Sequence, residues 1–174
     1  MPAVAHFISH SRPMSARKKY KSVLFLGGFF LGKIIVGGVI EKDGKFLLVQ
    51  EAQEKCRGKW NIPAGHLDAN ETISEGAKRE VFEECGCKVE LSGILQIVNK
   101  VKKDTSWISV VFSTILLEDN IVFDKDEILD VKWFSYEEIL NMKEELRDYA
   151  WITDAITALV NNRISDMGII KIME

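Results

Sequence analysis

The sequence contains few of the residues that crosslink a chain or bind soft metal ions. Among 174 residues there are three cysteines, Cys56, Cys85 and Cys87, and three histidines. The cysteines are odd in number and lack the spacing of a zinc site, so we expect free or packed thiols in a reducing compartment. The histidines are too widely scattered to form a metal-binding triad. These shortages argue against a disulfide scaffold and against a histidine-based metal centre.

Acidic residues are absent from the first forty positions, which carry six lysines and arginines. Because the whole chain has a net charge of -3, the remaining 134 residues carry a net charge of -9. Proteins that follow a nucleic-acid backbone need a basic surface. An acidic catalytic region therefore argues against a nucleic-acid polymer as the principal substrate.

The first 32 residues do not resemble part of an enzyme core. A basic run, Arg17–Lys21, precedes an apolar run, Val23–Leu31. This order is that of a signal peptide or anchor, but no small-residue cleavage site follows it and the apolar run is short for a membrane span. The acid-free start also resembles an organelle transit peptide. We favour a disordered or vector-derived leader, or an added edge strand at 23–30, over these alternatives.

The composition is that of an ordinary globular protein, with 47% hydrophobic and 28% charged residues. A chain of this length has room for one domain with a sizeable core. We expect that domain at residues 33–165, between the extension 1–32 and a C-terminal tail at 166–174. The expected location is the cytoplasm, with organelle targeting by residues 1–32 left open.

Runs of apolar and β-branched residues predict the strands. Residues 34–40 and 46–50 are two such runs, and the turn sequence between them predicts a hairpin. Further strands are expected at 88–91, 93–98, 107–117 and 128–134, and helices at 136–142 and 148–162. The second of these helices should face inwards with Trp151, Ile152, Ala155, Ile156, Leu159 and Val160. This order of elements predicts an α/β sandwich around a mixed sheet.

A further helix is expected between Thr72 and Gly86. Thr72 and Glu75 have the spacing of a capping box, and Gly86 stands where a helix usually ends in a left-handed residue. Ile73, Ala77 and Val81 recur every four residues and form a narrow apolar stripe. The helix should therefore pack one face on a core.

The same helix carries an unfavourable cluster of carboxylates. Glu80, Glu83 and Glu84 lie three and four residues apart, so they share one surface near the negative end of the helix dipole. Arg79 neutralises only part of this charge, for instance by pairing with Glu83. A hard divalent cation would relieve the rest. A solvated acidic face is the alternative that charge alone leaves open.

The spacing of these residues resembles a family signature. Residues 65–87 read GHLDANETISEGAKREVFEECGC. This is similar to the Nudix hydrolase signature: G, five residues, E, seven residues, R-E, an aliphatic, any, E-E, any, G, an aliphatic. The charged and glycine positions all match, and the one departure is Cys87 at an aliphatic packing position. The resemblance implies an α/β/α sandwich around a mixed β-sheet.

The resemblance also implies a chemistry. Nudix enzymes hydrolyse a nucleoside diphosphate linked to another moiety, and they use Mg²⁺ or Mn²⁺. The implied metal ligands are Gly65, through its carbonyl, with Glu80, Glu83 and Glu84. Either Glu83 or Glu84 would also polarise the attacking water, and the sequence does not separate ligand from base. Arg79 would hold the carboxylates in place, with Glu71 as a partner, although a purely structural pair is equally compatible.

Other site residues are expected outside this motif. Many family members use an acid from a later loop, and Glu127 is our candidate, with Asp124, Asp126 and Asp130 as competitors. Trp60 and Trp107 are candidates for stacking on a nucleobase, although a buried aromatic more often serves packing.

The range of possible substrates is limited mostly by the absence of residues that mark other branches of the family. ADP-ribose hydrolases commonly carry a proline after the motif, but Pro63 is the last proline here. Dinucleoside-polyphosphate hydrolases tend to have a tyrosine in that region, and none occurs between Gly86 and Trp133. Residues 49–66 resemble two branches, namely animal enzymes acting on oxidised guanine nucleoside diphosphates and a bacterial phosphatase acting on nucleotides and a thiamine-precursor pyrophosphate.

We therefore expect a nucleoside di- or triphosphate pyrophosphohydrolase of the house-cleaning type. The alternatives are hydrolysis of a non-nucleotide pyrophosphate and a non-catalytic Nudix-fold binding domain, which typically lacks the glutamates. The expected partner is a small pyrophosphate substrate, with no membrane and a monomeric or homodimeric state.

Overall fold

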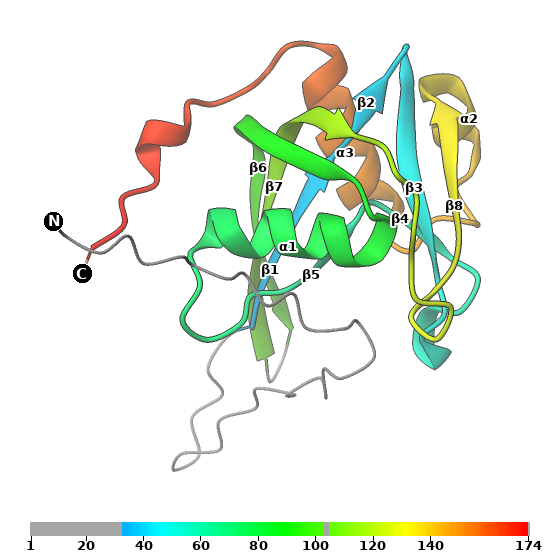
Figure 1. Cartoon of the computed structure of the whole chain (residues 1–174), viewed down its shortest axis with the longest axis horizontal. Coiled ribbons are helices and arrows are strands. Elements are labelled where there is room, and N and C mark those ends of the chain that lie inside the picture. Colours follow the sequence, from blue (N-terminus) through cyan, green and yellow to red (C-terminus); the bar gives the residue numbers. More distant parts are fainter. Residues whose placement is uncertain (1–32, 103–104, 174) are drawn as a thin grey trace, which may run out of the picture.

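The computed structural model describes residues 33–102 and 105–173, so the expectations for residues 1–32 lie outside it. A four-stranded sheet with the order β5-β1-β7-β6 lies at its centre (Figure 1). Its strands are β1 (Lys33–Val39), β5 (Ala64–His66), β6 (Lys88–Lys102) and β7 (Thr105–Glu118). β1 runs parallel to β7, whereas β5 and β6 pair antiparallel with their neighbours. The sheet is therefore mixed, as the sequence predicts.

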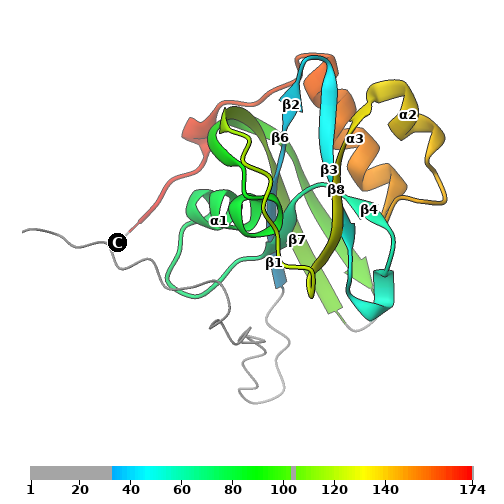
Figure 2. The same cartoon turned by 45° about the vertical axis from the view of Figure 1, so that its right-hand side comes forward.

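A second, antiparallel sheet stands beside the first (Figure 2). Its strands are β2 (Glu41–Lys42), β3 (Lys45–Glu51), β4 (Trp60–Asn61) and β8 (Ile128–Ser135). β3 is the central strand, because β2, β4 and β8 all pair with it. The sequence predicted a single mixed sheet, which corresponds to the first sheet, and the second sheet was not predicted.

The predicted hairpin between residues 34–40 and 46–50 is wrong in its pairing. β1 pairs with β5 and β7, while only the two-residue strand β2 forms a hairpin with β3. The chain passes from one sheet to the other at Ile40, whose carbonyl accepts a hydrogen bond from the amide of Leu47 at 3.0 Å. An apolar run that is covered on both faces suits the inner strand of a mixed sheet better than a two-stranded ribbon.

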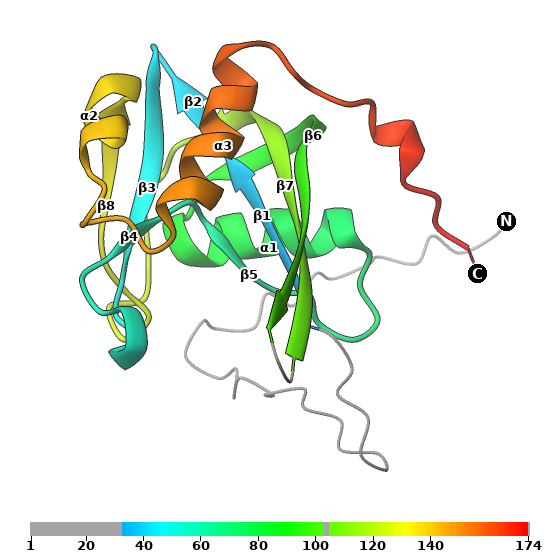
Figure 3. The same ribbon diagram turned by 180° about the vertical axis from the view of Figure 1, so that it is seen from behind.

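Helices cover both faces of the mixed sheet. They are α1 (Ile73–Cys85) and α3 (Tyr149–Val160). The short helix α2 (Tyr136–Asn141) lies instead beside β8 and α3, and two 3₁₀ turns are present, η2 (Glu54–Cys56) and η3 (Met167–Ile169). α1 lies on one side of the sheet and α3 on the other, as the views from the front and from behind show (Figures 1 and 3). This arrangement confirms the α/β sandwich. The inward position expected for Val160 is wrong, because its side chain is 48% exposed at the end of α3.

Successive side chains of β3 point to opposite faces of the second sheet and pack in two different apolar clusters. Phe46 and Leu48 pack in the cluster that contains α3, and Leu47 and Val49 pack in the cluster that contains the end of α1. Both faces of β3 are therefore covered by apolar side chains. The three cysteines are free, as expected.

The sequence divides β6 wrongly. Two strands were expected at 88–91 and 93–98, but one strand runs from Lys88 to Lys102 with register shifts near Gly93. A β-bulge accommodates an extra residue without ending a strand. Ser165, in the segment after α3, forms an isolated antiparallel bridge with Ile94 of β6.

Candidate active site

The caps of α1 fix the helix that carries the motif. The Thr72 hydroxyl accepts a hydrogen bond from the Glu75 amide at 3.1 Å, and the Glu75 carboxylate accepts one from the Thr72 amide at 2.8 Å. Gly86 ends the helix with φ at 75°. Ala77 and Val81 are fully buried. The predicted capping box, helix end and apolar stripe are all confirmed, so the carboxylates project from a rigid element.

Arg79 is the centre of the charged cluster on this helix. Its Nε and NH2 groups donate to the two carboxylate oxygens of Glu71 at 2.9 and 2.6 Å. Its NH1 group donates to Glu80 at 2.7 Å and to Glu83 at 3.1 Å. The hydrogen bonds that Arg79 donates to Glu71 raise the pKa of Arg79 further above its ordinary value. One permanent cation therefore orients three carboxylates.

The remaining carboxylates are fixed against the strand β5. Glu84 is 8% exposed and accepts a hydrogen bond from the Ala64 amide at 3.0 Å. Glu80 is 9% exposed and lies against Gly65, where a Cβ atom would approach its Oε2 atom to 2.2 Å. Gly65 is thus required at this position because a side chain would displace the Glu80 carboxylate. The structure brings Gly65, Glu80, Glu83 and Glu84 together, as the motif predicts.

This donor set suits a hard divalent cation. Carboxylate and carbonyl oxygens are the ligands that Mg²⁺ and Mn²⁺ prefer. Within residues 33–102 and 105–173, however, no three carboxylate, imidazole or thiol groups already surround one point as a ligand shell. The carboxylates are not arranged as a ligand shell because Arg79 binds one oxygen of Glu80 and one of Glu83. Glu80 and Glu83 would hold a metal ion here only with oxygens that Arg79 now binds.

The predicted residues outside the motif have different surroundings. Glu127 precedes β8, and its backbone carbonyl accepts a hydrogen bond from the Ala52 amide at 3.0 Å, which places it beside the end of β3. Trp60 is 8% exposed and packs edge-on against Phe134 with ring centroids 4.9 Å apart. Its ring belongs to the core, which is the packing role that the sequence left open.

Trp107 lies away from the centre of the motif. It pairs with Lys33 at the start of β1, whereas Gly65 pairs with Val36 on the opposite edge of that strand. Three residues along a strand correspond to roughly 10 Å. The Lys100 ammonium stands over the Trp107 ring, 5.7 Å from its centroid.

A second polar cluster was not predicted from the sequence. Glu51 ends β3, Asn61 ends β4, and Arg147 follows α2 in the chain. Glu51 accepts a hydrogen bond from the side-chain amide of Asn61 at 3.0 Å and another from the guanidinium of Arg147. The three residues are far apart in sequence. The available signal was an acid that ends a strongly apolar strand, since a buried carboxylate needs partners.

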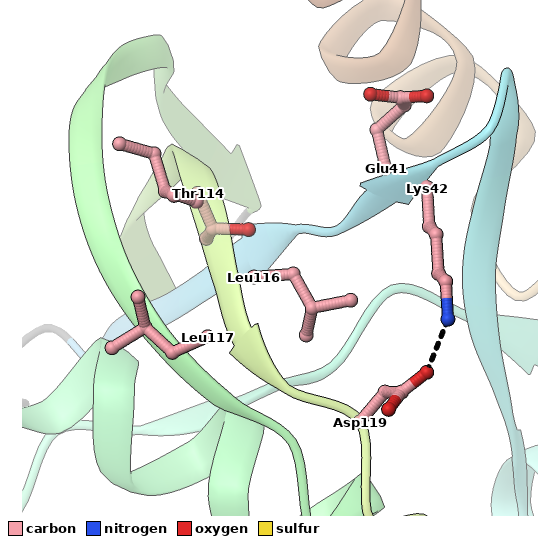
Figure 4. Close-up of a pocket in the computed structure, with 7 residues that line it drawn as sticks. Glu41, Lys42, Thr114, Leu116, Leu117 and Asp119 are labelled. Atoms are coloured by element: carbon pink, nitrogen blue, oxygen red, sulfur yellow. Dashed lines mark hydrogen bonds and ion pairs between the residues drawn. The ribbon is translucent and has the colours of Figure 1, made fainter.

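A surface hollow lies apart from both clusters (Figure 4). It is lined by Glu41, Lys42, Thr114, Ile115, Leu116, Leu117 and Asp119. Lys42 and Asp119 form an ion pair there that joins β2 to the end of β7. None of the predicted site residues lines this hollow.

Comparison with known proteins places the chain in a family. The NUDIX domain model matches residues 33–155, and the chain belongs to that family. The chain is similar to the phosphatase NudJ of Escherichia coli, with 35% identity over 115 residues that cover 64% of this chain and 73% of the relative. A NUDIX hydrolase structure from Nitrosomonas europaea superposes with a TM-score of 0.74 at 26% identity, covering 82% of this chain and 98% of that one.

An animal relative is similar over a shorter region. The human 8-oxo-dGDP phosphatase NUDT18 is 35% identical over 79 residues, which cover 45% of this chain. The matched region spans 24% of the human protein, so the similarity is confined to about a quarter of that relative. In the described part of the chain, no helix has the length and apolar character that a membrane crossing requires.

Proposed function

We propose that the chain is a divalent-metal-dependent pyrophosphohydrolase that cleaves a pyrophosphate bond in a nucleoside di- or triphosphate, including oxidised nucleotides. The observation that carries this proposal is the set of glutamates on α1, ordered by Arg79 and packed against Gly65. Family membership and the relatives named as phosphatases and hydrolases support it. The intact glutamates favour catalysis over the alternative of a non-catalytic binding domain.

The side chains of the site have distinct proposed roles. Glu80, Glu83 and Glu84, with the carbonyl of Gly65, would hold Mg²⁺ or Mn²⁺. A bound divalent ion neutralises charge on the phosphate oxygens and lowers the pKa of water. Arg79 keeps the carboxylates oriented through its hydrogen bonds to Glu71, Glu80 and Glu83.

The general base is proposed among the acids that face this site. Glu83 is the more accessible of the adjacent pair, with 33% of its side chain exposed against an overall exposure of 8% for Glu84. An exposed carboxylate is better placed to meet a water molecule and a substrate phosphate. Glu127, beside the end of β3, remains the candidate from the later loop.

The chemistry of the site and the names of the relatives support the proposed substrate class. One relative is named for its action on 8-oxo-dGDP, so oxidised guanine nucleotides come first among the substrates to test. A non-nucleotide pyrophosphate such as the thiamine precursor is the alternative that the same panel addresses.

The test is a phosphate- and pyrophosphate-release screen with Mg²⁺ and, separately, Mn²⁺. The panel holds normal and 8-oxo-guanine nucleoside di- and triphosphates, ADP-ribose, dinucleoside polyphosphates and the thiamine-precursor pyrophosphate. We expect metal-dependent turnover concentrated on a nucleoside di- or triphosphate. Turnover confined to another compound would overturn the substrate assignment, and inactivity on every compound would overturn the enzymatic one.

A further inference from the structure

Strand β6 is an outer strand of the mixed sheet. In the order β5-β1-β7-β6 it pairs along its length with β7, so its other edge presents backbone N–H and C=O groups outwards (Figure 3). The segment after α3 covers this edge at one point, the bridge between Ile94 and Ser165. From Gln96 onwards, none of the residues that the structure describes forms a bridge to this edge. An open edge of this kind pairs with another strand unless a local feature prevents it.

The stretch 96–102 of β6 lacks the features that usually block an edge. Bulges twist an edge strand away from partners, but the register shifts of β6 lie at or before Gln96, and the pairing with β7 is regular beyond it. The stretch contains no proline. A lysine on an edge discourages pairing, but Lys100 is held by its own chain, since its ammonium forms an ion pair with Asp148 at 2.6 Å. The edge is therefore regular and open.

The same stretch exposes apolar side chains on one face of the sheet. Ile97 is 57% exposed and Val101 is 71% exposed. Ile97 is opposite Val110 of β7, which packs in the apolar cluster under α1. Because opposite residues point to the same face and alternate residues share a face, Ile97, Asn99 and Val101 all lie on the α1 side. Ile108, opposite Asn99, adds a further exposed apolar side chain. A line of exposed apolar side chains along an open edge indicates an interaction surface.

The residues of this stretch complement each other when two copies run antiparallel. With a twofold axis at Asn99, Ile97 of each copy is opposite Val101 of the other, and Asn99 is opposite its counterpart. On the other face, the apolar stem of Lys100 is opposite Val98, so these positions bring no like charges together. An axis at Val98 or Lys100 would place Asn99 opposite an apolar residue, and the second would also place two lysines opposite each other. The sequence therefore favours one register.

The open edge lies far from the proposed catalytic site. β6 and β5 are the two opposite edges of the mixed sheet, and β5 carries Gly65, against which Glu80 is packed. A second copy that pairs with β6 is thus at the edge away from Gly65 and Glu80. Pairing and hydrolysis should be independent of each other.

We propose that two copies of this chain form a symmetric dimer by pairing their β6 strands antiparallel around Asn99. The two mixed sheets then form one continuous sheet. Backbone hydrogen bonds along the edge supply affinity, and the contacts between Ile97 and Val101 fix the register. The interface consists of one strand from each copy, so the dimer is weak, with a dissociation constant of about 10 µM.

The test is sedimentation velocity of the full chain over concentrations from about 1 to 300 µM. We expect monomer at the lowest concentration and dimer at the highest. Monomer at every concentration would overturn the proposal, and would leave the apolar run at residues 23–31 of the same chain as the candidate occupant of this surface.

Charge substitutions test the register. Ile97→Glu places a carboxylate opposite Val101 of the other copy, and Val101→Lys places an ammonium opposite Ile97, in each case twice by symmetry. Each single variant should raise the dissociation constant about a hundredfold. The double variant pairs opposite charges across the interface and should dimerise about tenfold more tightly than either single variant. Within one copy the two positions are roughly 13 Å apart along the strand, so this rescue requires a second copy.

A nearly isosteric change tests the position of the axis. Asn99→Asp places two carboxylates opposite each other and should raise the dissociation constant about fivefold. Glu90→Gln, at an exposed position of β6 outside the paired stretch, is the matched control and should keep the wild-type constant. A dimer that is unaffected by Asn99→Asp and by both single charge variants would be formed by another surface and would overturn the proposal.

The dimer and the enzymatic proposal can fail separately. Every variant at positions 97, 99 and 101 should keep the wild-type rate of nucleotide hydrolysis, because the paired edge is remote from Gly65. Circular dichroism of each variant shows that it is folded, and the wild-type sedimentation result needs no variant at all.

Discussion

The protein contains two arginine–carboxylate clusters that differ in how completely they are bonded. Around Arg79, the carboxylates of Glu71, Glu80 and Glu83 all receive hydrogen bonds from one guanidinium. Around Arg147, both donors of the cluster converge on a single oxygen of Glu51, and two buried acceptors have no partner. The first cluster therefore fixes the geometry of the glutamates on α1, whereas the second is bonded through one oxygen of Glu51.

The two clusters also differ in exposure. The Arg79 side chain is 19% exposed, while that of Arg147 is 41% exposed. Water therefore screens the charge of Arg147 more than the charge of Arg79, so the ion pairs of Arg147 are the weaker ones. Substitutions in the two clusters should therefore differ in effect, with catalysis and stability both affected at Arg79 and a smaller loss of stability at Arg147.

The largest effect is expected for Glu83→Gln. The substitution removes one negative charge from the proposed metal site, so turnover with Mg²⁺ should fall on the order of a thousandfold. The fold should persist, because the Glu83 side chain is 33% exposed. Nucleotide hydrolysis and thermal unfolding are measured together, with Glu90→Gln as the control. Wild-type turnover in Glu83→Gln would remove this residue from the catalytic site.

Arg79→Met should lower both activity and stability. The carboxylates of Glu71 and Glu80 are 14% and 11% exposed, and without the guanidinium they repel each other in a poorly hydrated place. Removing one partner of a buried ion pair costs about 3 kcal/mol. Arg79→Lys keeps the charge but loses the two-pronged contact to Glu71, so it should fall between Arg79→Met and wild type. Urea unfolding gives the order, and a wild-type midpoint for Arg79→Met would contradict it.

Arg147→Met should destabilise the protein by about 2 kcal/mol, less than Arg79→Met, because water already weakens the ion pair at the exposed Arg147 side chain. The uncompensated group is then the buried carboxylate of Glu51, which is 1% exposed. Adding Glu51→Gln removes that charge, so the double variant should be more stable than the sum of the two single effects implies. Strict additivity in urea unfolding would show that the two side chains do not interact.

The smallest effect is expected at the cap of α1, where it depends on pH. Hydrogen bonds from the Thr72 backbone and side chain lower the pKa of Glu75 below its ordinary value of 4.5. A lowered pKa in the folded state means that the stabilisation is complete above the unfolded value and is lost as the pH falls through the folded value. Glu75→Gln should therefore have a lower melting temperature than wild type at neutral pH, and the gap should close as the pH falls through the lowered pKa of Glu75, below 4.5. A gap that does not change with pH would contradict the assignment.

The sequence specified the first cluster and missed the second for a physical reason. The Arg79 cluster is built within residues 65–87, where helical spacing alone brings Arg79, Glu80 and Glu83 to one surface. The Arg147 cluster joins the ends of two strands to a residue 96 positions beyond Glu51. Its formation depends on how β3, β4 and the segment after α2 pack, which no local pattern encodes.

The fold shows the same division. The capping box of α1, its end at Gly86 and the mixed α/β class were predictable, because each follows from local spacing or from element order. The transfer of the chain between two sheets at Ile40 was not, since the apolar run 34–40 suits either a hairpin or an inner strand. The burial of Trp60 was likewise not predictable, because it depends on packing against Phe134 and α3, which are distant in the sequence.

The most direct test of the central claim is turnover of a guanine nucleoside diphosphate before and after removal of divalent cations. The glutamates of α1 are proposed to act through Mg²⁺ or Mn²⁺, so the wild-type protein should be inactive in the presence of a chelator. Adding back excess Mg²⁺ or Mn²⁺ should restore turnover in the wild-type protein and leave Glu83→Gln inactive. Turnover that survives complete chelation would contradict the account, because the carboxylate cluster would then have no part in the chemistry.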